Sequence, residues 1–226
     1  MLVLIPAYNE AKRIAPVIAG ALTSDLPVLV VDDGSRDDTV AVAEQAGATV
    51  LRQTPNQGKG AALRAGMRWA LERGHNGVIT LDADGQHDPA QILGFVVRHS
   101  ITQSDLIIGA RNFDEMPTTR RIANELGRRS FSWAVGEYVE DNQSGYRLLS
   151  KRMMEAVLDS DEQGFEFEVE MIVICLQKGY TLDWIPIRTI YGDQGSHINP
   201  VKHMVNWVRI VLKTRRAMRK KPTSDQ

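Results

Sequence analysis

Hydrophobic and polar positions along the chain follow two recurring patterns. Short continuous apolar runs bounded by Gly, Pro or acidic residues are typical of strands that are buried on both faces. Apolar residues that recur every three or four positions, such as Leu63, Met67 and Ala70, are typical of helices with one buried face. Because the two patterns alternate, we expect an α/β fold.

The first part of the chain, residues 1–111, predicts a parallel sheet. Strands joined through helices run parallel to one another, and the helices cover both faces of their sheet. The expected strands lie at 2–5, 28–31, 49–52, 78–81 and 106–109. The expected helices lie at 10–22, 37–46, 58–73 and after Pro89.

The pattern changes after Arg111. We expect a loop at 112–119, a basic helix at 120–135, a strand that ends near 149, a helix at 164–178 and a strand at 181–188. Pro186 makes the last strand irregular or places it at an edge of the sheet. The complete prediction is a single Rossmann-like, mixed and mostly parallel sheet flanked by helices, followed by an amphipathic C-terminal helix.

Composition narrows the class of protein. The chain has 226 residues, 43% of them hydrophobic, and one cysteine, which excludes a disulfide framework. We find no signal peptide and no apolar stretch long enough to span a membrane, and so expect a cytoplasmic protein. The net charge of −1 is unevenly distributed: eight Lys or Arg and one Asp follow residue 196, a net of +7 against −8 for residues 1–196. Such a tail favours an anionic partner.

Polar residues follow four of the expected strands, and these are the candidate site. Ligands of open α/β sheets bind beyond the carboxyl ends of the strands. Asp82 and Asp84 are two residues apart, so in an extended chain their side chains leave on the same side. Paired carboxylates attract a hard divalent cation, which can hold a diphosphate. Alone, the pair is also compatible with a solvated acidic turn.

Two common nucleotide-binding motifs are absent. No Gly-x-Gly-x-x-Gly follows the first strand, and Gly58-Lys59-Gly60 lacks the spacing and the hydroxyl residue of a Walker A loop. The segment opens a helix, so either a phosphate contact or a plain turn fits it.

Several motifs together resemble a known family. They are Pro6-Ala7-Tyr8-Asn9-Glu10, Asp32-Asp33-Gly34-Ser35, Asn56-Gln57-Gly58-Lys59-Gly60 and Asp82-Ala83-Asp84-Gly85-Gln86-His87. In this order they resemble family-two inverting glycosyltransferases with the GT-A fold. Two further segments, 143–147 and 165–171, are similar to the dolichol-phosphate mannosyltransferase-like branch. The resemblance divides the chain into a GT-A domain at 1–200, with a nucleotide-sugar half at 1–111 and an acceptor half at 112–200, and a basic amphipathic tail at 201–226.

The resemblance implies roles on the donor side. Asp82, Asp84 and Gln86 would hold Mg²⁺ or Mn²⁺ against the diphosphate of a UDP- or GDP-linked sugar, and Arg111 would contact donor phosphate. Val31 and Asp33 would contact base or ribose. The remaining expected donor-binding residues are Pro6, Ala7, Tyr8, Glu10, Lys59, Ala83 and His197.

It also implies an acceptor. A polyprenyl phosphate is already ionised, so catalysis would consist of positioning and of stabilising the leaving group. Arg121, Arg128 and Arg147 would grip that phosphate, although the helical arginines also fit a solvated basic face. If the acceptor were a hydroxyl of a glycan or lipid, Asp141 would be the candidate base.

Two alternative hypotheses about function are weighed next, followed by the role of the basic tail. A nucleotidyltransferase also uses strand-end carboxylates, but its Gly-rich basic loop after the first strand is absent. A nucleic-acid binder leaves the carboxylates at the strand ends unexplained, because they would repel phosphate. The basic amphipathic tail fits peripheral contact with the inner face of a membrane, or docking on the domain with a solvated end.

Overall fold

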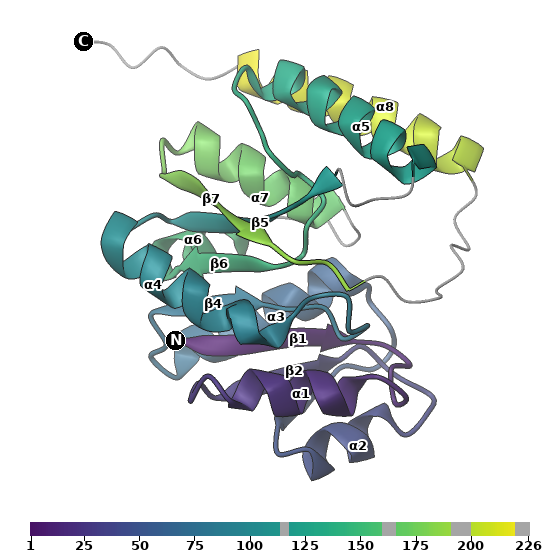
Figure 1. The fold of residues 1–226 in the computed structure, drawn as a ribbon, viewed down its shortest axis with the longest axis vertical. Helices are drawn as coiled ribbons and strands as arrows, with labels where there is room; N and C mark the ends of the chain where they lie inside the picture. Colours follow the sequence, from purple (N-terminus) through teal and green to yellow (C-terminus); the bar gives the residue numbers. More distant parts are fainter. Residues whose placement is uncertain (114–117, 160–165, 191–199, 220–226) are drawn as a thin grey trace.

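The computed structural model describes residues 1–113, 118–159, 166–190 and 200–219, apart from the side chains of 119, 120, 166 and 200–205. One seven-stranded sheet, in the order β3-β2-β1-β4-β6-β5-β7, runs through the described chain (Figure 1). β6 pairs antiparallel with both of its neighbours, and every other pair is parallel. The strands are β1 (Leu2–Ala7), β2 (Val28–Asp32), β3 (Thr49–Arg52), β4 (Gly77–Thr80), β5 (Leu106–Arg111), β6 (Arg147–Ser150) and β7 (Leu182–Ile187).

The helices cover both faces of this sheet because β1 is apolar along its whole length and β2 is apolar from Val28 to Val31. Alternate side chains of a strand point to opposite faces. Leu2 and Leu4 therefore join one buried cluster, while Val3 and Ile5 join the other. The first cluster packs against α3 (Lys59–Glu72), α6 (Lys151–Val157) and α7 (Glu166–Gln177). The second packs against α1 (Ile14–Leu22), α2 (Thr39–Gln45) and α4 (Ile92–Thr102), which follows the short helix η1 (Pro89–Gln91).

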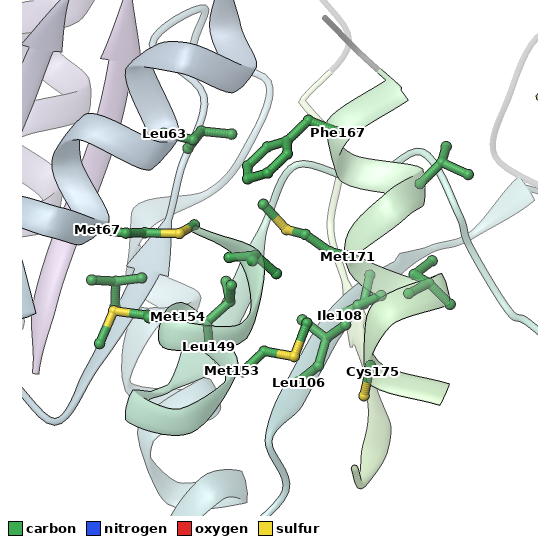
Figure 2. Close-up of a cluster of buried hydrophobic side chains, with 14 of the residues drawn as sticks. Leu63, Met67, Leu106, Ile108, Leu149, Met153, Met154, Phe167, Met171 and Cys175 are labelled. Carbon is green, nitrogen blue, oxygen red and sulfur yellow. The ribbon is translucent and has the colours of Figure 1, made fainter. Parts of the chain in front are cut away.

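Methionines fill much of the space between α3, α6 and α7. Figure 2 shows Met67, Met154, Met153 and Met171 lying between the sheet and these helices. The unbranched, flexible side chain of Met fits irregular gaps where three helices meet one sheet. This packing fixes α7, which carries Glu168, against the middle of the sheet.

Two helices lie outside the two layers. α5 (Thr118–Val135) and α8 (Pro200–Arg219) run alongside each other beyond α7 (Figure 1). Trp207 joins them: its ring lies 6.2 Å from that of Phe131, and its indole N–H donates to Ser130 Oγ at 3.0 Å. In the described part of the chain, no helix is both long and apolar enough to cross a membrane.

The predicted α/β fold, with its mixed and mostly parallel sheet, is confirmed, as is a C-terminal helix. β7 lies at an edge of the sheet, as Pro186 suggested. Two features were not predicted, namely the place of antiparallel β6 in the middle of the sheet and the short helix α6. The signal for α6 was present, since Ser150 Oγ accepts a hydrogen bond from the Met153 N–H and caps the helix.

Candidate functional site

A cleft of about 330 Å³ opens at the carboxyl ends of β1, β2 and β4. Because these strands are parallel neighbours, the turns that follow them meet at one edge of the sheet. The lining residues are Pro6, Ala7, Tyr8, Glu10, Asp33, Asn56, Gly58, Lys59, Ala62, Asp82, Ala83 and Asp84. Nine of the expected donor-binding residues are thus brought together: Pro6, Ala7, Tyr8, Glu10, Asp33, Lys59, Asp82, Ala83 and Asp84.

Lys59 lies between two carboxylates at this cleft. Its Nζ is 2.6 Å from Asp82 Oδ1 and 3.0 Å from Glu168 Oε1. The Asp82 side chain is 25% exposed and that of Glu168 only 6%. Burial by itself disfavours the charged ammonium, but the two carboxylates outweigh it and raise the pKa of Lys59. Burial likewise opposes ionisation of Asp82, but the ammonium beside it leaves the pKa of Asp82 lowered. Both groups are therefore charged at neutral pH.

Gly145 makes this approach of two carboxylates possible. A Cβ at this position would lie 2.7 Å from Asp82 Oδ2 and 2.9 Å from Glu168 Oε1, closer than real Cβ contacts come. The Gly145 carbonyl accepts a hydrogen bond from Thr80 Oγ1 at 2.6 Å, which ties it to the end of β4. The sequence analysis assigned no role to Gly145 or Glu168. Their only signal was that both fall in the motifs at 143–147 and 165–171 that carried the family resemblance.

The loop after β4 is organised around Asp84. Its carboxylate accepts from the backbone N–H of Gln86 at 2.9 Å and from the Gln86 side-chain amide at 2.7 Å. The Gln86 carbonyl in turn accepts from the Ile190 N–H at 2.9 Å, so the segment after β7 supports this loop. His87 is buried against Tyr146, with the ring centroids 5.1 Å apart, and burial lowers its pKa.

The oxygen atoms around this loop fit a divalent cation. No group of three or more His, Cys, Asp or Glu side chains with metal-binding geometry occurs among the described residues. Asp82 and Asp84 nevertheless line one cleft, and the side-chain amide of Gln86 lies against Asp84. Carboxylate and amide oxygens are the hard ligands that Mg²⁺ and Mn²⁺ take. The ammonium of Lys59 already places positive charge against Asp82.

Of the two residues expected to contact base or ribose, Val31 is contradicted and Asp33 stays a prediction. The side chain of Val31 is fully buried in the core of the sheet, because β2 has helices on both faces, so it cannot touch a nucleotide. Asp33 lines the cleft, but its oxygens accept from the backbone N–H groups of Gln57 at 2.8 Å and Gly58 at 2.7 Å. It therefore anchors the loop that leads to Lys59.

Glu10 is a partly buried acid at the edge of the cleft. Burial raises its pKa, against the opposing effect of Arg13. Its Oε2 lies 3.2 Å from Arg13 Nη1 in an ion pair, but it accepts no hydrogen bond among the described residues. This oxygen can still accept a hydrogen bond, which makes Glu10 a candidate contact for ligand hydroxyls.

Arg111 and Asp141 form an ion pair with two hydrogen bonds. Arg111 Nε and Nη2 lie 2.6 and 3.0 Å from the two Asp141 oxygens, and Asp141 also accepts from the Gln143 N–H at 3.0 Å. Asp141 is 1% exposed. A carboxylate that is buried and engaged in this way is poorly placed to accept a proton from a substrate.

Arg147 does not lie where the sequence analysis expected it. The residue is 1% exposed, and its guanidinium donates to the backbone carbonyls of Ser144, Asn142 and Glu168. It is buried because β6 lies in the middle of the sheet with α7 packed over it. All three contacts hold backbone, so Arg147 fixes the 142–145 turn and the start of α7, and it does not reach an acceptor phosphate.

The remaining basic residues lie on α5 or outside the described chain. Arg121 is exposed, and Arg128 is held by Glu125 at 2.5 Å and by the Tyr138 hydroxyl at 2.8 Å. Their contact with an acceptor stays a prediction. His197, expected to close over the donor, falls at 191–199, outside the described residues.

Comparison with known proteins decides the family. The model of "Glycosyl transferase family 2" matches residues 2–153, about two thirds of the chain. The chain belongs to this family. It is 32% identical over 214 residues to the undecaprenyl-phosphate mannosyltransferase of Micrococcus luteus, covering 87% of this chain and 86% of that protein. It is 30% identical to the polyprenol monophosphomannose synthase of Mycolicibacterium smegmatis, covering 86% and 78%.

These relatives confirm the dolichol-phosphate mannosyltransferase-like branch and a glycosyltransferase activity. Among solved structures, glucosyl-3-phosphoglycerate synthase from Mycobacterium tuberculosis, in complex with Mn²⁺, UDP and glucosyl-3-phosphoglycerate, matches with a TM-score of 0.73 and 18% identity, covering 99% of this chain and 81% of that one. At this identity the match supports the GT-A fold.

Proposed function

We propose that this glycosyltransferase moves a sugar from a nucleotide-sugar donor to a polyprenyl phosphate, with inversion at the sugar carbon and with Mg²⁺ or Mn²⁺ bound. The observation that carries the proposal is the strand-end cleft, in which Asp82, Asp84 and Lys59 converge on a space large enough for part of a nucleotide. The names of the two relatives above support the acceptor, and the Mn²⁺ and UDP of the solved neighbour support the donor.

The donor half, residues 1–111, would bind the nucleotide sugar. Asp82, Asp84 and Gln86 would hold the divalent cation, which supplies positive charge to the departing diphosphate. Lys59 would add a second positive charge at the same place, and Tyr8, exposed at the rim, offers a face for the base. Arg111 can turn two N–H groups toward donor phosphate if its pair with Asp141 opens.

The acceptor half, residues 112–200, would present the phosphate. A phosphate oxygen is ionised at neutral pH and attacks the sugar carbon as the diphosphate leaves from the other side, which inverts that carbon. No base is needed for this step. The engagement of Asp141 by Arg111 and by backbone supports this acceptor over a hydroxyl, which would require a proton acceptor.

The helix pair α5 and α8 offers a surface for the lipid end of the acceptor. Ile122, Leu126 and Trp133 are exposed on α5, and Val208 and Leu212 are exposed on α8. Cations stand among them: Arg121, Arg129, Arg209, Lys213 and Arg216. Apolar side chains interleaved with Lys and Arg suit the headgroup region of an anionic bilayer. We assign peripheral membrane contact to this face.

The donor is tested by thermal shift of the full chain with UDP, GDP and their sugars, with and without Mn²⁺. Ligands that bind only the folded state raise Tm, by an amount that grows with ligand concentration over Kd. We expect one base to be preferred and Mn²⁺ to enlarge its shift. Absence of a shift with every nucleotide and nucleotide sugar would contradict the proposal.

The membrane surface is tested by sedimentation with vesicles of phosphatidylglycerol and phosphatidylcholine. The double variant Leu126→Ser with Leu212→Ser should lose most of its binding to the anionic vesicles. The matched control is Leu93→Ser with Val97→Ser, which removes two exposed apolar side chains from α4. Equal sedimentation of the two double variants would exclude the α5–α8 face.

A further inference from the structure

The cleft contains a positive charge, the Lys59 ammonium, beside one of the proposed metal ligands. Lys59 Nζ lies 2.6 Å from Asp82 Oδ1, at ion-pair distance from one of the two carboxylates assigned to the cation. Lys59 is the first residue of α3, and Asp82 follows β4, so two central elements of the sheet hold them together. The Asp82 oxygen that pairs with this ammonium cannot bind a divalent cation until the ion pair opens.

Glu168 is a second carboxylate partner of the Lys59 ammonium, and it is not one of the proposed metal ligands. Its Oε1 lies 3.0 Å from Lys59 Nζ, and the side chain is almost fully buried at the start of α7. Arg147 bonds to the Glu168 backbone carbonyl, and the ring of the adjacent Phe167 packs beneath Arg64 of α3 at 5.0 Å. Glu168 is therefore held in place, whereas the ammonium of Lys59 is carried by a flexible four-carbon chain.

A buried carboxylate is costly unless it is paired. Without Lys59, Asp82 and Glu168 would face each other across Gly145, where both already approach within 3 Å of the site of a Cβ. With Lys59 between them, two negative charges share one positive charge. A divalent cation that binds Asp82 would replace the Lys59 ammonium there and add positive charge to the cleft. The ammonium would then keep Glu168 as a partner and gain any anion that enters the cleft.

We propose that Lys59 is the resident counter-cation of Asp82, which a divalent cation replaces as the donor binds, and that Glu168 is the positioning residue that keeps the displaced ammonium beside the diphosphate. This inference rests on the proposed function. It makes metal and nucleotide bind cooperatively, because the cation alone must break the ion pair of Lys59 with Asp82. The diphosphate then gives the freed ammonium a new partner.

The proposal is tested by binding of Mn²⁺ alone to the full chain, followed by the electron paramagnetic resonance signal of free Mn²⁺. Lys59→Met should tighten nucleotide-free Mn²⁺ binding by about tenfold, within the usual range of coupling between two ligands. Glu168→Gln should weaken nucleotide-free Mn²⁺ binding, because the Lys59 ammonium then has Asp82 as its remaining carboxylate partner of the two and is harder to displace. Opposite signs at two residues in contact are not expected of damage to the fold.

Cooperativity is the second measurement. The ratio of Mn²⁺ dissociation constants without and with UDP or GDP should be large in the wild type and several-fold smaller in Lys59→Met. The matched controls are Lys178→Met and Glu155→Gln, which make the same changes at exposed positions and should leave both constants unchanged. Circular dichroism melting shows whether each variant is folded.

The double variant decides how Glu168 acts. If it acts through Lys59, adding Glu168→Gln to Lys59→Met should leave Mn²⁺ affinity unchanged. A large loss in that background would make Glu168 a metal ligand and overturn the proposal. If Lys59→Met does not fold, Lys59→Arg replaces it, and its nucleotide-free Mn²⁺ affinity should be no higher than that of the wild type.

Failure of this proposal is distinguishable from failure of the proposed function. Wild-type binding of Mn²⁺ in the presence of nucleotide, with no change in nucleotide-free affinity on Lys59→Met, would overturn the counter-cation and leave the glycosyltransferase assignment standing. Absence of Mn²⁺ binding to the wild type with every nucleotide would contradict the metal assignment itself.

Discussion

Asp82 and Asp105 stand at opposite ends of the sheet, and each faces a cation. Asp105 precedes β5 and is 2% exposed. Its oxygens accept from Arg152, from Ser150 Oγ at 3.0 Å, and from the N–H and Oγ1 of Thr181, both at 2.9 Å. Asp82 is more exposed and has Lys59 at 2.6 Å, with a second carboxylate close by.

The difference separates a structural carboxylate from the one that we propose as a metal ligand. Asp105 has donors from three directions and joins the start of β5 to the end of β6 and the start of β7. Asp82 shares its cation with Glu168 and lines an open cleft. A carboxylate whose hydrogen bonds are complete stabilises the fold, whereas one that keeps an exchangeable partner can bind a ligand.

The largest expected effect is on activity at the cleft. Asp84→Asn should lower kcat/KM for the nucleotide sugar by at least about a hundredfold, because it removes a charge that holds the cation against the leaving group. Tm should stay within a few degrees of the wild type, since the Asn carbonyl still accepts from the Gln86 backbone N–H and only the hydrogen bond from the Gln86 side-chain amide to the other oxygen is lost. Steady-state kinetics with Mn²⁺ measure the first and calorimetry the second. Retained activity would remove Asp84 from the metal site.

The opposite end of the sheet should show the reverse pattern. Asp105→Asn should lower the free energy of unfolding by about 2 kcal/mol through weakened hydrogen bonds to charged donors, and leave KM for the donor unchanged. Urea unfolding at pH 7 measures the first. A change in donor KM larger than the change in stability would contradict the separation of the two ends.

The same variant has a pH signature. Burial alone would raise the pKa of Asp105, but hydrogen bonds from Arg152 and Thr181 outweigh it and lower that pKa well below its ordinary value. The unfolded chain then binds more protons than the folded one as the pH falls, so the stability contributed by Asp105 is complete above about pH 4 and is lost below it. The wild type and Asp105→Asn should therefore converge in stability in acid.

Gly145 tests whether the cleft depends on close carboxylates. Gly145→Ala should raise the donor KM by about tenfold, because overpacking by one methyl group must move Asp82 or Glu168. Gly127→Ala is the control, since neither glycine has a positive φ and a Cβ at position 127 would meet nothing closer than 3.8 Å. An unchanged KM would show that the two carboxylates can separate without loss of donor binding.

The smallest expected effect is on the acceptor side. Arg121→Gln should raise KM for a polyprenyl phosphate a few-fold and leave donor KM unchanged, since a solvated cation contributes only about 1 kcal/mol to a phosphate contact. Arg129→Gln, about two turns further along α5 and also exposed, is the comparison. Equal effects on donor and acceptor KM would contradict an acceptor role for this end of α5.

Sequence alone determined the order of the strands and of all the described helices except the short η1 and α6, because continuous apolar runs and helical spacing are local patterns. It also placed Asp82, Asp84 and Glu10 at one cleft, because parallel strands bring their carboxyl ends to the same edge whatever the partner residues are. The place of Lys59 at this cleft was implied only by the family resemblance. The expected roles of Val31 and Arg147 were wrong because burial depends on which elements cover a strand. No local pattern placed β6 in the middle of the sheet or laid α7 over Arg147.

Only the tertiary structure decided the partners. Glu168 is 109 positions from Lys59, and Asp141 is 30 from Arg111, yet each pair is in contact. Such pairs depend on the packing of α7 and on the turn before β6, which bring distant charges together where little water remains. That packing places Glu168 beside Lys59 and Asp141 beside Arg111, and so determines that the cation paired with Asp82 has a second carboxylate as partner.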